Sequence, residues 1–131
     1  MKTMIKIGFL GLCIVVLFSC ATKTVTVEEG ILDIKVTIGP FCPVAPCNIT
    51  EAEKESRYGA YSLIITNKLQ KDISFQKTVT IANISQKLPV GNYEINISPS
   101  TIFSGRGFPK EVKIEKDKTT NLIIDIDTGI R

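Results

Sequence analysis

"ILDIKVTIG", residues 31–39, alternates apolar and polar side chains along almost its whole length. Every even position from Leu32 to Ile38 is apolar, whereas the odd positions from Asp33 to Thr37 are polar. Successive side chains of a strand point to opposite faces. The pattern therefore predicts a β-strand that buries one face and exposes the other.

The same alternation recurs along the rest of the chain, with turn-forming residues between the segments. The further strands are expected over 60–66, 75–83, 92–98, 111–115 and 121–127, and a seventh around 72–76. Strands with one apolar face must pair and bury that face against a second sheet. The sequence thus predicts an all-β fold, a small antiparallel β-sandwich of about seven strands.

One segment outside this pattern has the signals of a short helix. Thr50 and Glu53 have the spacing of a capping box at the start of residues 51–57. A polar loop explains the same residues equally well, and the sequence leaves the two interpretations open.

The beginning of the chain has the features of an export signal. Lys2 and Lys6 flank the start of an uncharged apolar stretch, 7–18, which is shorter than the about 20 residues that a membrane-spanning helix needs. "LFSC", 17–20, resembles the lipobox of bacterial lipoproteins, in which the cysteine receives a diacylglycerol and the chain is cleaved before it. An ordinary signal peptide with a chance cysteine is the alternative.

The expected organisation follows from this start. We expect a lipoprotein signal peptide over 1–19, a lipid-bearing Cys20 with a tether over 20–29, and a β-sandwich domain over 30–131. Acyl chains such as palmitate would hold the protein in a membrane of the bacterial cell envelope, with the domain facing the periplasm or the exterior.

Composition excludes several classes of activity. The chain has no histidine, which removes Ser-His and Cys-His catalysis and histidine-ligated zinc. It also has no tryptophan. Once Lys2 and Lys6 leave with the signal, the charges nearly balance, and no basic run has the character of a nucleic-acid site. We expect no cofactor, no metal and no nucleic-acid partner.

Two cysteines remain in the domain, Cys42 and Cys47, in "FCPVAPC". An exported compartment permits disulfides, so a structural Cys42–Cys47 bond is predicted. The alternative is a redox or metal pair. A redox pair usually has two intervening residues rather than four, and a metal site would need further ligands.

Two places in the domain are candidate sites. Asp125 and Asp127 would lie on one strand face about 7 Å apart, where they could act as an acid-base pair or bind calcium. The alternative is solvated edge charges, paired with Lys113 or Arg131.

The second candidate is the loop "PSTIFSGRGFP", 99–109, in which Arg106 stands between two glycines. Arginine can grip a carboxylate or phosphate in a bidentate manner, so Phe103, Arg106 and Phe108 are candidate partner-binding residues. The alternative is that the two phenylalanines cap the open end of the sandwich.

Three stretches resemble carboxypeptidase regulatory-like domains, which have a transthyretin-like sandwich. "LPVGNYEINI", 88–97, resembles their proline-x-glycine-x-tyrosine turn, in which Pro89 and Gly91 would shape the turn and Tyr93 would enter the core. "VTIGPFCPVAPC", 36–47, and "DTGIR", 127–131, resemble a bacterial subgroup. The resemblance implies a transthyretin-like or immunoglobulin-like sandwich that acts as a stability, adhesion or binding module and has no agreed catalytic residues.

The functional expectation is a lipid-anchored, non-enzymatic binding or structural module. One alternative is a partner-binding subunit of an envelope complex that uses the 99–109 loop. The other is a small hydrolase that uses Asp125 and Asp127.

Overall fold

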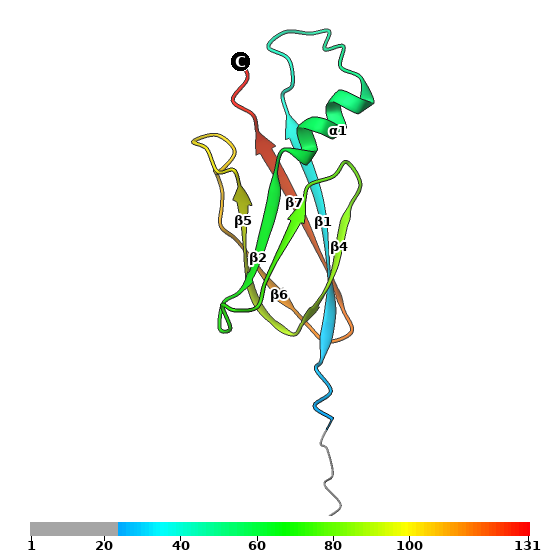
Figure 1. The fold of residues 1–131 in the computed structure, drawn as a ribbon, viewed down its shortest axis with the longest axis vertical. Coiled ribbons are helices and arrows are strands. Elements are labelled where there is room, and N and C mark those ends of the chain that lie inside the picture. The colour runs from blue at the N-terminus through cyan, green and yellow to red at the C-terminus, as the bar shows by residue number, and fades with distance from the viewer. Residues whose placement is uncertain (1–23) are drawn as a thin grey trace, which may run out of the picture.

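The computed structural model describes residues 24–131, which form seven strands and one helix (Figure 1). The elements are β1 (Glu29–Gly39), α1 (Glu51–Gly59), β2 (Ser62–Asn67), β3 (Ser74–Thr78), β4 (Ile84–Pro89), β5 (Gly91–Ser98), β6 (Lys110–Ile114) and β7 (Thr119–Asp127). The strands make two sheets, of order β4-β1-β7 and β3-β2-β5-β6. The predicted all-β sandwich is confirmed.

One pair of strands departs from the antiparallel expectation. β1 and β7 are parallel, with Val36 opposite Ile124, whereas the other pairs in the described chain are antiparallel. β6 runs antiparallel to β5, and residues 115–118 reverse the chain between β6 and β7. β7 therefore runs opposite to β6, in the same direction as β1. The two strands lie side by side in Figure 1.

The core lies between the two sheets and consists mainly of the side chains that the alternation predicts, together with Ile84 and Leu88 of β4 and Tyr58 of α1. From β1, every even residue from Leu32 to Ile38 is buried. β5 supplies Tyr93, Ile95 and Ile97 to the same core. The fully buried members outside these two strands are Leu63, Ile65, Val79, Leu88, Ile114, Ile124 and Ile126.

The predicted strand over 75–83 is wrong in its second half. β3 ends at Thr78, and residues 79–83 carry the chain from one sheet to the other. Val79 is buried, but Ile81 is exposed instead of pointing inward. The seventh strand is β4, because residues 72–76 belong mostly to β3.

The turn after β4 holds Tyr93 in place. The Tyr93 ring is fully buried, and its hydroxyl donates a hydrogen bond to the Pro89 carbonyl at 2.9 Å. Such a tyrosine corner is a feature of β-sandwiches. Gly91 has a φ of 159°, which is close to extended backbone, so glycine is needed here for space: a Cβ would come within 3.0 Å of the Asn67 side-chain nitrogen.

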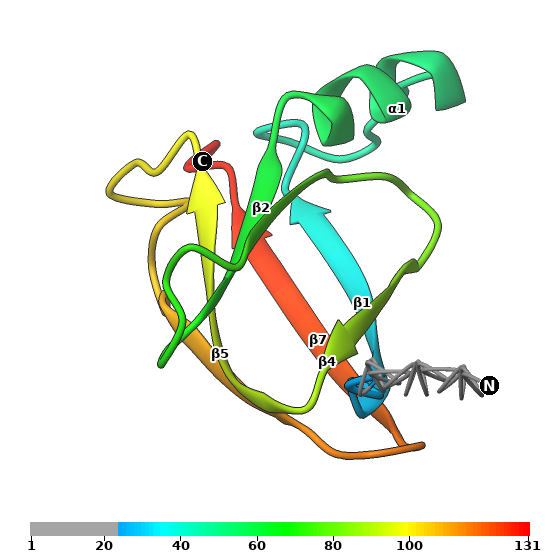
Figure 2. The same cartoon turned by 60° about the horizontal axis from the view of Figure 1, so that its bottom comes forward.

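The helical interpretation of residues 51–57 is confirmed and extends to Gly59. The Thr50 hydroxyl accepts from the Glu53 amide at 3.2 Å, and the Glu53 carboxylate accepts from the Thr50 amide at 2.8 Å. α1 buries only Tyr58, whose hydroxyl accepts from the Ile38 amide. The helix therefore covers the end of β1 (Figure 2).

The strand directions give the sandwich two distinct ends. The upper end comprises residues 40–61, 79–83, 99–109 and 128–131, and the lower end comprises 24–28, 68–73, 90 and 115–118. In Figure 1 the chain enters β1 at the lower end, and α1 and the C-terminal residues lie at the upper end. No helix in residues 24–131 is long and apolar enough to cross a membrane.

Candidate functional site

The upper end collects the sequence features that were predicted separately. The disulfide loop follows β1, the 99–109 loop joins β5 to β6, and residues 128–131 follow β7. All three strands reach this end, so their loops become neighbours although they are distant in sequence (Figures 1 and 2).

The 99–109 loop is held by its own hydrogen bonds. The buried Ser104 hydroxyl donates to the Pro99 carbonyl at 3.2 Å and accepts from the Thr101 amide at 3.0 Å. The Gly105 amide donates to the Thr101 carbonyl at 2.9 Å. These hydrogen bonds hold the backbone of the loop, and Ile102 projects from it with 81% of its surface exposed.

The aromatic residues of this loop differ in their surroundings. Phe108 is half-buried and packs against the core, which fits the capping interpretation. Phe103 lies against Gly129, where a Cβ would come within 2.4 Å of the ring, and the Arg131 guanidinium sits 5.9 Å from the ring centroid. Gly129 also has a φ of 76°, a conformation that favours glycine.

Arg131 fixes the carboxylate of Asp127. The guanidinium nitrogens lie 2.6 and 3.1 Å from the two carboxylate oxygens, and the Gly129 amide donates to the same carboxylate. The hydrogen bonds from Arg131 and Gly129 lower the pKa of the Asp127 carboxyl to about 2. Asp127 is therefore ionised at neutral pH and engaged by its own chain.

The proposed acid-base pair has little support in this geometry. Asp125 lies exposed on the outer face of β7, while Asp127 is paired with Arg131. Lys113, the other suggested partner, lies 3.5 Å from Glu115 instead. Within residues 24–131, no cluster of three or more acidic, histidine or cysteine side chains could hold a metal ion.

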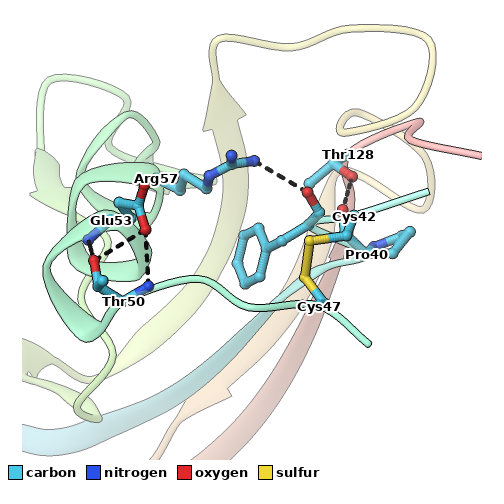
Figure 3. The surroundings of a disulfide bond; sticks show 8 residues. Pro40, Cys42, Cys47, Thr50, Glu53, Arg57 and Thr128 are labelled. Carbon is cyan, nitrogen blue, oxygen red and sulfur yellow. Dashed lines mark hydrogen bonds between the residues drawn. A yellow bond between two sulfur atoms is a disulfide. The ribbon is translucent and has the colours of Figure 1, made fainter. Parts of the chain in front are cut away.

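The predicted disulfide between Cys42 and Cys47 is present, with the Cα atoms 5.5 Å apart. Its loop is tied to neighbours on both sides (Figure 3). The Thr128 hydroxyl donates to the Pro40 carbonyl, and the Arg57 guanidinium donates to the Phe41 carbonyl at 3.4 Å. These contacts connect β1, α1 and the residues after β7 into one surface.

A second arginine-aromatic contact lies beside the disulfide loop. The Arg57 guanidinium is 5.5 Å from the centroid of the Phe41 ring, and that ring is 6.2 Å from the ring of Tyr58. A shallow cleft is lined here by Phe41, Arg57, Tyr61 and Ile130, among others. Its lining is mostly apolar and aromatic, and it also includes Arg57 and Thr128.

The charges of the upper end are distributed unevenly. All three arginines of the chain, Arg57, Arg106 and Arg131, lie there. Only Arg131 makes an ion pair with a carboxylate within the described residues. The segments 40–50, 99–109 and 128–131 contain no aspartate or glutamate. The acidic residues of this end lie in α1, which carries Glu51, Glu53 and Glu55, so the three loop segments are the part of the surface that suits an acidic partner.

The sequence did not indicate every residue of this surface. Phe41, Arg57, Tyr61 and Ile130 were not among the predicted site residues, because only the topology brings them together. Cys20, the predicted lipid attachment residue, lies outside the described residues.

No model of a known protein family matches the sequence, and no curated protein matches it. Among solved structures, the chain is similar to a leucine-rich repeat protein from Bacteroides thetaiotaomicron, at 14% sequence identity and a TM-score of 0.42. The likeness covers 80% of this chain and 14% of that protein.

Proposed function

We propose that the protein is a lipid-anchored, non-enzymatic binding module of the bacterial cell envelope. Acylation of Cys20 would attach it to a membrane, and the upper end would bind an acidic partner protein. The observation that carries the proposal is the placement of the two ends: the chain enters the domain at the lower end, opposite the arginine-bearing loops (Figure 1).

The fold sets the distance between membrane and binding surface. β1 has 11 residues and runs from the lower end to the upper end. The ten steps between its first and last residues, at about 3.3 Å each, separate the ends by roughly 33 Å. An anchored domain would thus present the 99–109 loop away from the bilayer.

The choice of an acidic partner rests on exposed, unneutralised cations. Arg57 and Arg106 have no carboxylate within ion-pair distance in residues 24–131, and both are exposed. Ile102, in the same loop as Arg106, and Val44, in the disulfide loop, have 81% and 75% of their surfaces accessible. Arginine next to exposed apolar and aromatic side chains is the composition typical of protein interfaces.

We further propose that the domain belongs with the carboxypeptidase regulatory-like sandwiches. The buried Tyr93, its bond to Pro89 and the two-layer sheet arrangement support this assignment. A binding role without catalysis agrees with the polar, self-paired surroundings of Asp127.

The anchor is tested first. Metabolic labelling with a fatty-acid probe is expected to mark the native protein and not the Cys20→Ser variant, which should also leave the membrane fraction. An unlabelled native protein that fractionates exactly like Cys20→Ser would refute the anchor.

The binding surface is tested with a photo-crosslinking residue placed at Ile102 of the anchored protein in its native envelope. We expect a protein adduct that is lost in Arg106→Glu and in Arg57→Glu, because each reverses the charge that attracts the partner. The matched control places the crosslinker at Ile123, exposed by 67% on the outer face of β7. The same adducts at both positions, or adducts that survive both reversals, would contradict the proposal.

A further inference from the structure

The hairpin between β2 and β3 presents one apolar side chain on a rigid tip. Leu69 has 87% of its surface exposed. The buried side chain of Asn67 fixes the turn, since its carbonyl oxygen accepts from the Leu69 and Gln70 amides at 2.9 Å each. The Lys68 amide donates to the Asn92 carbonyl of β5. The exposure of Leu69 is therefore built into the turn rather than caused by a loose loop.

Other apolar side chains lie exposed at the same end. Val90, in the one-residue link between β4 and β5, is 41% exposed, and Val27 is 56% exposed. In Figure 1 the β2–β3 hairpin and the β4–β5 link lie in the lower part of the molecule, where the chain enters β1.

Most lysines at this end are paired with carboxylates, although the exposed Lys71 of the β2–β3 turn makes no ion pair within the described residues. Lys68 pairs with Glu111, Lys87 lies 2.7 Å from Glu29, and Lys116 lies 2.9 Å from Glu28. Ion pairing weakens the attraction of these lysines to an acidic surface. The exposed apolar side chains are therefore the feature of this end that is most suited to a contact.

The short chain between Cys20 and β1 favours the membrane as the surface that these side chains contact. Nine peptide units join Cys20 to Glu29. A fully extended chain of that length spans about 30 Å at most. A tether this short keeps the lower end at a high effective concentration near the membrane, so even a weak apolar contact would be populated.

We propose that the lower end rests on the lipid bilayer, with Leu69 and Val90 inserted at the boundary between headgroups and acyl chains. This inference rests on the proposed lipid anchor and adds an orientation to it: the sandwich stands upright on the membrane and its arginine-bearing end points away.

The absence of tryptophan allows a direct test in the full acylated protein. Leu69→Trp and, as the matched control at the other end, Ile102→Trp are reconstituted into phosphatidylethanolamine and phosphatidylglycerol vesicles with brominated acyl chains. Bromine quenches only fluorophores that reach the acyl region. We expect Leu69→Trp to emit about twofold less than in unbrominated vesicles and Ile102→Trp to be unchanged.

A second pair of variants removes the contribution of the new tryptophan. Val90→Trp should be quenched while Leu69 is present, and this quenching should be lost in the Val90→Trp, Leu69→Asp double variant. The inference would be overturned if Leu69→Trp were quenched no more than Ile102→Trp. It would also be overturned if Val90→Trp were quenched equally with and without Leu69→Asp.

Flotation of the vesicles separates this inference from the anchor. Protein that floats with the vesicles but shows no quenching at position 69 retains the anchor and loses the membrane contact. Acylation-competent protein that does not float overturns both.

Discussion

Replacing Tyr93 by Phe removes one hydroxyl from the centre of the structure and leaves the ring in place. The hydroxyl donates to the Pro89 carbonyl at 2.9 Å, and the residue is fully buried. Leaving a buried polar group without its partner costs about 1–3 kcal/mol. Pro89 is half-buried, so water can reach its carbonyl in part. We therefore expect a loss of about 1–2 kcal/mol in the free energy of unfolding.

The assay is thermal unfolding followed by circular dichroism, with the disulfide intact. For a domain of this size, 1 kcal/mol corresponds to about 4–8 °C, so the expected fall in Tm is roughly 5–15 °C. Tyr61→Phe is the matched control, because Tyr61 is half-buried and its hydroxyl makes no hydrogen bond within residues 24–131. Equal Tm values for the two variants would refute the role assigned to the hydroxyl.

Three further perturbations have defined outcomes. Cys47→Ser opens a six-residue loop and should lower the free energy of unfolding, measured by urea titration, by about 2 kcal/mol. The wild-type protein should show the same loss once its disulfide is reduced. Gly129→Ala adds a Cβ at a φ of 76° and against the Phe103 ring, so a loss of about 1–3 kcal/mol is expected in the same titration, and an unchanged midpoint would argue against the packing described. The pKa of the Asp127 carboxyl falls from its ordinary value of 3.8 to about 2 in the folded protein. Its pairing with Arg131 therefore stabilises the fold fully above pH 3.8, and this contribution is lost as the pH falls towards 2. NMR titration of the carboxyl should give a midpoint near 2, which should rise in Arg131→Gln.

The period-two alternation was sufficient to predict the fold class, because a sandwich strand exposes one face and buries the other. β4 was missed because one of its inward positions is polar: the half-buried Gln86 lies between the buried Ile84 and Leu88. Pro89 also carried the signal of a turn, although an edge strand tolerates proline at its end. The crossing at 79–83 continues the apolar pattern of β3, so the sequence alone places the strand end too late.

The candidate surface was predictable in its parts and not in its assembly. The short spacing in "FCPVAPC" indicated the disulfide, and the spacing of Thr50 and Glu53 indicated the helix that carries Arg57. No local pattern relates Arg57 to Ile130, because their proximity depends on β1 and β7 running parallel. Leu69 was not predicted as a contact residue for a different reason. A single leucine between polar residues does not indicate a contact surface until the structure shows that it is exposed.

The position of β1 between β4 and β7 has a consequence for how the chain acquires its structure. Strand β1 is made first, yet its parallel neighbour is the final strand, with Val36 meeting a residue 88 positions later. Pairings this remote in sequence make folding slow, since a long loop must close before the contact forms. The three-stranded sheet can therefore be completed only after synthesis has passed residue 127, and until then the apolar face of β1 depends on β4 alone. A nascent chain of this protein should remain open to chaperones and proteases for nearly its entire length.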